Sequence, residues 1–190
     1  MNKGLLVVIS GPSGVGKGTI IKNVLQSLPS ALLSVSMTTR LPRAGEVEGK
    51  DYFFVTKEKF LQLKEEDYFL EWAEVFGCFY GTPKHFVEKN LQEGKIVILE
   101  IDVKGAKKLK DKNIKGVYIF ITTPSIEVLK ERLIHRATDS EEKINYRLGI
   151  ATKELEEACN YDYVVVNDKL YNAVKEVKNI IINEYKRRGI

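Results

Sequence analysis

The sequence contains few of the residues that build disulfide frameworks and metal centres. Among 190 residues there are two cysteines, Cys78 and Cys159, and two histidines, His85 and His135. The cysteines lack the spacing of a metal site and are too few to hold a secreted fold together, so we expect free thiols in a reducing compartment. Neither histidine lies beside a candidate nucleophile, and we interpret both as ordinary surface or core residues.

Long apolar runs and blocks of one charge are also missing. No run approaches the roughly 18 residues of a membrane span. Residues 1–4 lead directly into an apolar strand, which leaves no room for a signal peptide. We therefore expect a cytoplasmic protein without a membrane partner. The formal charge of +4 is spread along the chain and not gathered in a tail, which argues against nucleic acid as a partner.

A phosphate-binding loop is the clearest feature that is present. Residues 5–10 form a short apolar run, after which G-P-S-G-V-G-K-G-T opens a helical pattern. A strand, a glycine-rich loop and a helix start direct backbone N–H groups and a helix dipole at one anion. We predict that this loop binds a nucleoside triphosphate through Gly11, Pro12, Ser13, Gly14, Val15, Gly16, Lys17, Gly18 and Thr19.

The loop departs from the strict pattern G-x-x-x-x-G-K-[ST] at one position. Gly18 stands where a hydroxyl residue is usual, and the hydroxyl arrives one residue later, with Thr19. Lys17 keeps its place as a point charge for the outer phosphates. Direct coordination of magnesium by Thr19 is therefore left open.

The rest of the chain alternates apolar strands with amphipathic helices. This pattern predicts one α/β domain, with a P-loop parallel sheet and helices on both of its faces. Ligands bind at the carboxyl edge of such a sheet. We expect core strands at about 5–10, 31–35, 96–102, 116–121 and 163–166.

Two insertions are expected at that edge. Residues 34–90 are expected to form an antiparallel lobe that includes a polar loop at 36–52 and a hairpin around residues 77–78. Residues 126–148 are expected to form a helical lid. The core of the domain would then comprise about 1–33, 91–125 and 149–190.

Cationic side chains are what phosphoryl transfer requires most, because catalysis depends mainly on positioning and on positive charge around the migrating group. Several cations would converge on the loop if the two insertions fold over it. The catalytic candidates are Lys17, Arg40, Arg43, Arg132, Arg136 and Arg147.

The available side chains also restrict which molecule can accept the phosphoryl group. A phosphate monoester is largely a dianion at neutral pH, needs no strong base, and suits arginine forks and tyrosine hydroxyls. Guanine presents N1–H and N2–H₂ as adjacent donors, which a carboxylate and a hydroxyl can bind, whereas N1 of adenine would repel a carboxylate. Spacing alone does not place the available groups in one pocket. They are Ser36, Glu71, Thr82 and Asp102 for a base, and Arg40, Arg43, Tyr52 and Tyr80 for a phosphate.

Together these motifs resemble the guanylate kinase family, and the resemblance covers nearly all of the chain. Beyond the loop it rests on S-M-T-T-R-L-P-R-A-G-E-V-E-G-K-D-Y-F-F at 36–54, E-W-A-E at 71–74, Y-G-T at 80–82, E-I-D-V-K-G at 100–105, the R-x-x-x-R pair and V-N-D at 166–168. It implies transfer of the γ-phosphoryl group of ATP to GMP, giving ADP and GDP, which recycles GMP in purine nucleotide metabolism. Mg²⁺ would be the cofactor, held mainly by the ATP phosphates.

The resemblance also implies a role for each candidate residue. Ser36, Glu71, Thr82 and Asp102 would contact guanine, and Arg40, Arg43, Tyr52 and Tyr80 would hold the GMP phosphate. Lys17 and the loop amides would hold ATP, with Asn167 near adenine. The transferring phosphoryl group would be clamped by Arg132, Arg136 and Arg147.

Two alternatives have to be weighed against this interpretation. A guanylate-kinase-like binding module would keep the fold as a protein-interaction surface, but it has no reason to keep an intact ATP loop. A kinase for AMP, UMP or dTMP would not need the carboxylate-bearing pocket. The sequence does not decide whether dGMP is accepted or whether the chain forms a homo-oligomer.

Overall fold

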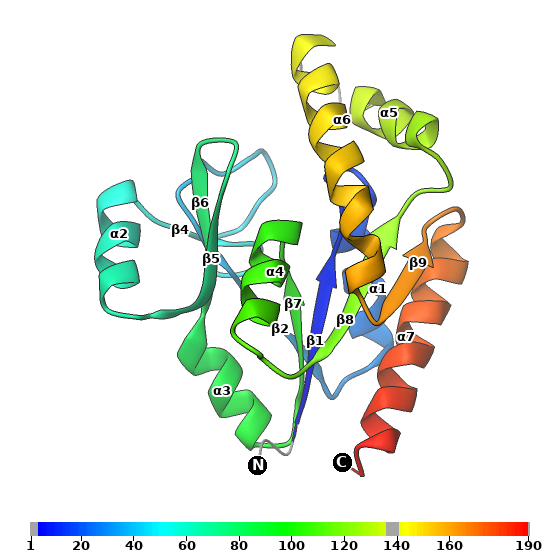
Figure 1. Cartoon of the computed structure of the whole chain (residues 1–190). Coiled ribbons are helices and arrows are strands. Elements are labelled where there is room, and N and C mark those ends of the chain that lie inside the picture. The colour runs from blue at the N-terminus through cyan, green and yellow to red at the C-terminus, as the bar shows by residue number, and fades with distance from the viewer. Residues whose placement is uncertain (1–3, 136–140, 190) are drawn as a thin grey trace.

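The computed structural model describes residues 4–135 and 141–189, and its core is a five-stranded parallel sheet with the strand order β2-β7-β1-β8-β9 (Figure 1). Every neighbouring pair in this sheet runs parallel, which confirms the predicted core. The second strand ends two residues earlier than expected. The strands are β1 Leu5–Ser10, β2 Ala31–Leu33, β7 Ile96–Glu100, β8 Val117–Thr122 and β9 Tyr163–Val166.

Helices cover both faces of this sheet because side chains alternate along each strand. Leu5, Val7 and Ile9 of β1 pack on one face with α1 (Lys17–Ser27) and α7 (Leu170–Arg187). The intervening Leu6 and Val8 pack on the other face with α3 (Lys84–Gln92) and α4 (Val103–Asp111). A strand that is apolar on both faces is what a sheet covered on both sides requires.

A second sheet, with the order β4-β3-β6-β5, forms the lobe on the left of Figure 1. Its own small core joins Phe60 and Leu63 of α2 to Phe69. The elements are β3 Met37–Thr38, β4 Phe53–Phe54, α2 Lys57–Glu65, β5 Phe69–Val75 and β6 Cys78–Pro83.

The lobe differs from the expectation in two ways. The segment 36–52, expected to be a loop, contains β3, and β3 pairs parallel with β4, so the sheet is mixed and not purely antiparallel. Parallel neighbours need a crossover of about a dozen residues, and the connection 39–52 supplies it. The hairpin turns at Phe76 and Gly77 instead of at 77–78, because Val75 pairs with Cys78.

Two further helices, α5 (Ile126–His135) and α6 (Glu141–Glu156), lie above the carboxyl edge of the core sheet (Figure 1). A short 3₁₀ turn, Glu157–Asn160, leads from α6 into β9. Arg136, which we predicted to be catalytic, lies outside the described residues. The exact division of the chain into core, lobe and lid stays a prediction. Across residues 4–135 and 141–189, no helix is both long and apolar enough to cross a membrane.

Candidate active site

The predicted phosphate loop joins β1 to α1 at the carboxyl edge of the core sheet. Gly11 has φ 136°, and a Cβ atom there would lie 2.1 Å from the Ile121 carbonyl oxygen, so only glycine fits. Lys17 Nζ donates to the carbonyl oxygens of Gly11, at 2.6 Å, and Pro12, at 3.0 Å. The lysine is thus folded back over the loop whose amides are predicted to bind phosphate.

Residues from two distant segments meet this loop. The Asn167 side chain donates from Nδ2 to the Val15 carbonyl oxygen at 2.7 Å, and Arg132 donates to the same oxygen at 3.4 Å and to the Asn167 carbonyl oxygen at 2.8 Å. The structure therefore brings Asn167, predicted to lie near adenine, and Arg132, predicted to clamp the transferring phosphoryl group, against the loop. A pocket at this junction is lined by Gly14, Gly16, Thr19, Arg132, Asn167, Asp168 and Leu170.

Strand register brings together the groups that could bind a base. Glu71 of β5 pairs with Thr82 of β6, and the Thr82 hydroxyl donates to Glu71 Oε1 at 2.6 Å. Asp102 is the N-cap of α4, where its Oδ1 accepts from Gly105 N at 2.9 Å. A Cβ atom at Gly105 would lie 2.5 Å from Glu71 Oε2 and 3.0 Å from Asp102 Oδ1, so both carboxylates approach this glycine.

Ser36 is not joined to this group by any hydrogen bond among the described residues. It is buried beside β3, and its carbonyl oxygen accepts from Phe53 N at 2.9 Å. Three of the four predicted base-binding residues are therefore assembled, whereas Ser36 directly precedes β3, the neighbour of β6 in the same sheet.

Burial changes the proton affinity of the carboxyl pair. Glu71 is only 3% exposed, and this burial raises its pKa to about 7, against the opposing effect of the Thr82 hydrogen bond. The nearby Asp102 carboxylate raises the Glu71 pKa further, while Lys108 and Lys112 lower it. Burial also raises the pKa of Asp102. Such a carboxyl pair is costly to the fold and is typical of a binding site.

This cost predicts a pH dependence of stability. The pKa of Glu71 rises from its ordinary value of 4.5 to about 7 in the folded chain, so the folded state binds more protons between these values. Stability contributed by the protonated form is present below pH 4.5 and is lost as the pH rises through 7. From pH 5 to 8, the wild-type chain should lose up to about 3 kcal/mol of unfolding free energy relative to Glu71→Gln.

Urea unfolding at pH 5, 6, 7 and 8 measures this difference. Glu74→Gln, which changes an exposed carboxylate on the same strand, is the matched control and should follow the wild type. Parallel stability profiles for the wild type and Glu71→Gln would contradict the shifted pKa.

Two of the predicted phosphate ligands, Arg40 and Arg43, form hydrogen bonds with a residue that sequence reasoning missed. Glu46 accepts two hydrogen bonds from the Arg40 guanidinium, at 3.0 and 2.8 Å, and a third from the Arg43 backbone N–H at 2.7 Å. The Arg40 guanidinium lies 5.3 Å from the centre of the Tyr52 ring, which contacts the Tyr80 ring edge-on at 6.0 Å. An acidic residue among several cations in one loop was the signal that could have identified Glu46.

Charge and burial also change the pKa values of Glu46 and Tyr52. Hydrogen bonding to Arg40 lowers the pKa of Glu46, so both partners stay charged. Burial raises the pKa of Tyr52 to about 12, and the Glu100 carboxylate adds to this effect. The hydroxyl of Tyr52 is therefore a donor at neutral pH. The Arg43 side chain itself is exposed.

Two further carboxylates near the loop were not predicted. Glu100, at the end of β7, lies beside Gly18, where a Cβ atom would be 3.4 Å from Glu100 Oε2. Glu154 of α6 has a pKa raised to about 7 by burial, with Lys17 acting in the opposite direction and Asp102 in the same direction. The position of Glu100 at the end of a core strand could have indicated it from the sequence. Glu154 comes near Lys17 only in the folded chain, so no sequence pattern indicated it.

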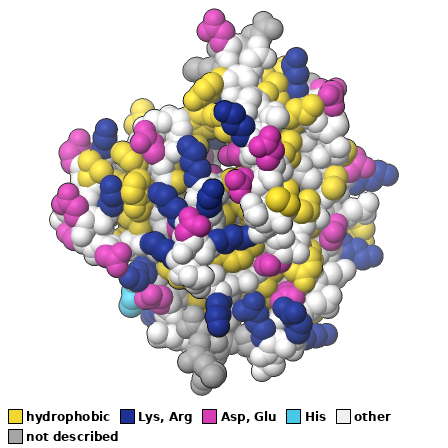
Figure 2. Space-filling model, in the orientation of Figure 1, with side chains coloured by type: hydrophobic (Ala, Val, Ile, Leu, Met, Phe, Trp, Pro, Cys, Tyr) yellow, Lys and Arg dark blue, Asp and Glu magenta, His cyan; other side chains and the backbone are white. Residues whose placement is uncertain are grey.

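Arg147, the last predicted cation, lies on α6. Its guanidinium carbon is 5.4 Å from the centre of the Phe76 ring at the tip of the lobe hairpin. Figure 2 shows further Lys and Arg side chains gathered over α4, on the face between the lobe and α6. Within residues 4–135 and 141–189 there is no cluster of three or more side chains suited to a metal ion.

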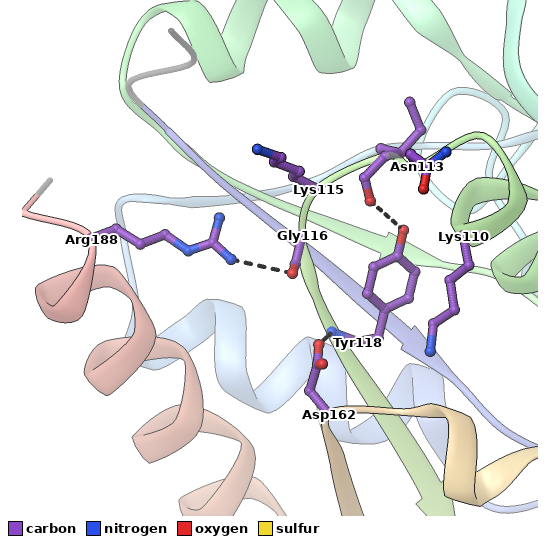
Figure 3. A pocket seen from close by; sticks show the side chains of 8 residues that line it. Lys110, Asn113, Lys115, Gly116, Tyr118, Asp162 and Arg188 are labelled. Atoms are coloured by element: carbon purple, nitrogen blue, oxygen red, sulfur yellow. Dashed lines mark hydrogen bonds between the residues drawn. The ribbon is translucent and has the colours of Figure 1, made fainter.

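A second pocket lies at the amino end of β8 and shares no residue with these clusters (Figure 3). Several of its polar groups bond to one another: the Tyr118 hydroxyl donates to the Ile114 carbonyl oxygen at 2.7 Å, and Arg188 donates to the Gly116 carbonyl oxygen at 3.2 Å. Ligands of open α/β sheets bind at the opposite, carboxyl edge. The candidate active site is therefore the region around the phosphate loop.

Known proteins resemble the chain over almost its whole length. The family model described as guanylate kinase matches residues 3–184. A guanylate kinase of Caldanaerobacter subterraneus subsp. tengcongensis is 54% identical over 182 residues, which cover 96% of this chain and 88% of the relative. A guanylate kinase of Clostridium perfringens is 53% identical over 183 residues, covering 96% and 85%. The crystal structure of guanylate kinase from Anaplasma phagocytophilum matches with a TM-score of 0.81 and 38% identity, covering 96% of this chain and 86% of that chain.

Proposed function

Because this chain belongs to the guanylate kinase family, we propose that the residues assembled at its carboxyl edge carry the transfer of the γ-phosphoryl group of ATP to GMP. The reaction gives ADP and GDP. The observation that supports the site most strongly is the buried group of Glu71, Thr82 and Asp102. Its acceptor oxygens match the N1–H and N2–H₂ donors of guanine, and Ser36 would complete the contact with the base.

On the ATP side, the loop from Gly11 to Thr19 would hold the phosphates through its backbone N–H groups. Lys17 now bonds to two loop carbonyl oxygens, and its ammonium group would turn to the outer phosphates when they bind. Asn167 already contacts Val15 and would lie beside adenine.

On the GMP side, Arg40, Arg43, Tyr52 and Tyr80 would hold the acceptor phosphate. Glu46 fixes Arg40 through two hydrogen bonds, and the two side chains are only 14% and 18% exposed. The guanidinium is thus oriented before the ligand arrives, and a dianionic phosphate would share it with Glu46.

The transfer step breaks the bond between the γ-phosphorus and the oxygen that ADP keeps, and forms a bond from that phosphorus to a phosphate oxygen of GMP. The attacking oxygen is already ionised, so no side chain has to remove a proton from it. Negative charge spreads over the equatorial oxygens in the transition state. Lys17, Arg132, Arg136 and Arg147 would stabilise this charge.

Magnesium fits the donor set at the start of α1. The Thr19 hydroxyl and the Glu100 carboxylate supply the hard oxygen ligands that Mg²⁺ prefers, and Glu100 lies beside Gly18, where the usual loop hydroxyl is missing. We propose that the ATP phosphates would hold the ion mainly, with the Glu100 carboxylate as a protein ligand, directly or through water. Thr19, which lines the pocket beside Asn167, would be a second oxygen donor. Bound there, the ion would neutralise charge on the phosphates.

The assignment of Arg43 is tested by comparing GMP with guanosine. In Arg43→Ala, turnover with GMP should fall about a hundredfold and GMP affinity about fiftyfold, because charge-assisted hydrogen bonds to phosphate are lost. Guanosine, which lacks the phosphate, should bind the variant and the wild type equally. Calorimetric titration with both ligands and steady-state kinetics measure these effects.

Lys50→Ala removes an exposed cation from the same loop and is the matched control. It should leave the binding of GMP within about twofold of the wild type, since surface charges far from a ligand contribute little. Near-normal kinetics of Arg43→Ala would refute the role of Arg43.

We also propose that the enzyme works in the cytoplasm and accepts dGMP. Cys78 and Cys159 are both free thiols, which suits a reducing compartment. All of the contacts proposed for the acceptor address its base or its phosphate, so the 2′-hydroxyl group does not enter the recognition.

A further inference from the structure

The hairpin between β5 and β6 carries an aromatic residue that turn chemistry disfavours. Phe76 and Gly77 form its two-residue loop, with φ values of 52° and 76°. Such a loop favours Asn, Asp or Gly at its first position, because a bulky side chain is strained when φ is positive. Phe76 is 47% exposed, so burial does little to offset this strain. A residue that breaks a local rule without stabilising the fold suggests a functional role.

The Phe76 ring contacts two residues of α6. The centres of the Phe76 and Tyr146 rings are 6.0 Å apart at an angle of 67°, and the Arg147 guanidinium carbon lies 5.4 Å from the centre of the Phe76 ring. These contacts join the tip of the lobe hairpin to the helix that carries a predicted catalytic arginine.

A ring holds an arginine in a different way from a carboxylate. The attraction acts between the positive charge and the π-system of the ring and does not use the N–H donors. A ring can therefore hold an arginine without competing with phosphate oxygens for those donors.

We propose that Phe76 is a positioning residue for Arg147, and that its ring holds the guanidinium on the side of the site that faces the lobe. This inference rests on the proposed role of Arg147 in stabilising the transferring phosphoryl group. The lobe, which carries most of the predicted GMP ligands, would then also position an arginine of the predicted lid. Phe76 touches neither substrate itself.

Phe76→Asn separates this role from a structural one. Asparagine is favoured at the first position of this turn, so the urea midpoint should be unchanged or higher. The single-turnover rate of phosphoryl transfer at saturating ATP, Mg²⁺ and GMP should fall about fivefold, the loss expected for one cation–π contact. Because the contact acts in the transition state, the KM values for ATP and GMP should stay within about twofold.

Two further variants serve as controls. Phe76→Tyr keeps a ring and should restore the rate to within about twofold of the wild type. Phe86→Ala removes another exposed phenylalanine, from α3, and should leave the rate unchanged. A Phe76→Asn variant that transfers phosphoryl at the wild-type rate would overturn the inference.

A double mutant distinguishes this inference from the proposed function. If Arg147→Ala alone transfers phosphoryl normally, the proposed role of Arg147 fails, and the inference fails with it. If Arg147→Ala is slow and Phe76→Asn is normal, only the inference fails. The inference is supported if Phe76→Asn slows the wild type but causes no further loss in Arg147→Ala. Equal losses in both backgrounds would show that the ring acts elsewhere and would overturn it.

Discussion

Lys17→Met is expected to lower kcat about a thousandfold, because one positive charge directed at the outer ATP phosphates is removed. Methionine keeps the unbranched stem, so the packing at the start of α1 should survive. The hydrogen bonds from Lys17 to Gly11 and Pro12 are lost, yet Gly11 stays enclosed by the Ile121 carbonyl group, which keeps the loop in place.

Steady-state kinetics with ATP, Mg²⁺ and GMP measure the effect, with a thermal melt to confirm folding. Lys22→Met removes an exposed lysine from the same helix and should keep kcat within about twofold, as surface charges usually do. A folded Lys17→Met variant that retains more than a tenth of the wild-type kcat would contradict the proposed role of Lys17.

Glu71→Gln should have the second largest effect, and it should act on the choice of base. The substitution replaces one carboxylate oxygen with an NH₂ group that faces the guanine donors. Charge-assisted hydrogen bonds contribute about 1.5–3 kcal/mol each, and the substitution weakens the two that N1–H and N2–H₂ would donate, so kcat/KM for GMP should fall at least about a hundredfold. The new amide can donate to N1 of adenine, so the preference for GMP over AMP should shrink by a similar factor.

This prediction is checked by measuring kcat/KM of the wild type and of Glu71→Gln with GMP and with AMP. Glu74→Gln, in the same strand but exposed, should leave both values unchanged. If Glu71→Gln kept the wild-type preference for GMP, the base would have to be recognised elsewhere.

Elements with a strong local pattern were predicted correctly from the sequence. The apolar run of β1 and the loop that follows it are determined by neighbouring residues, and both were found where the pattern placed them. The parallel order of the core followed from the alternation of strands and helices.

The pairing of distant segments could not be predicted in the same way. Glu71 and Thr82 meet because β5 and β6 pair in one particular register, which includes an irregularity between Phe69 and Glu71. A shift of one residue would place either side chain on the other face. Asp102 was expected at a strand end, but β7 stops at Glu100 and Asp102 caps α4.

The missed residues share a physical reason. Glu154 and Phe76 belong to none of the motifs, and their partners, Lys17 and Arg147, reach them only through the folded chain. Glu46 lies inside the motif at 36–54, but its hydrogen bonds to Arg40 are visible only in the structure. An isolated acidic or aromatic residue is most often part of a solvated surface, so only a contact in three dimensions distinguishes Glu154 and Phe76 from such residues.

The central claim is that this site transfers phosphoryl from ATP to GMP because it recognises guanine. A coupled assay of ADP formation with ATP and Mg²⁺ tests it most directly, with GMP, AMP, UMP, CMP and dTMP offered separately. We predict turnover with GMP and none above background with the other four. Turnover with another monophosphate would contradict the recognition of guanine by Glu71, Thr82 and Asp102, and no turnover with any of the five would contradict the enzymatic account as a whole.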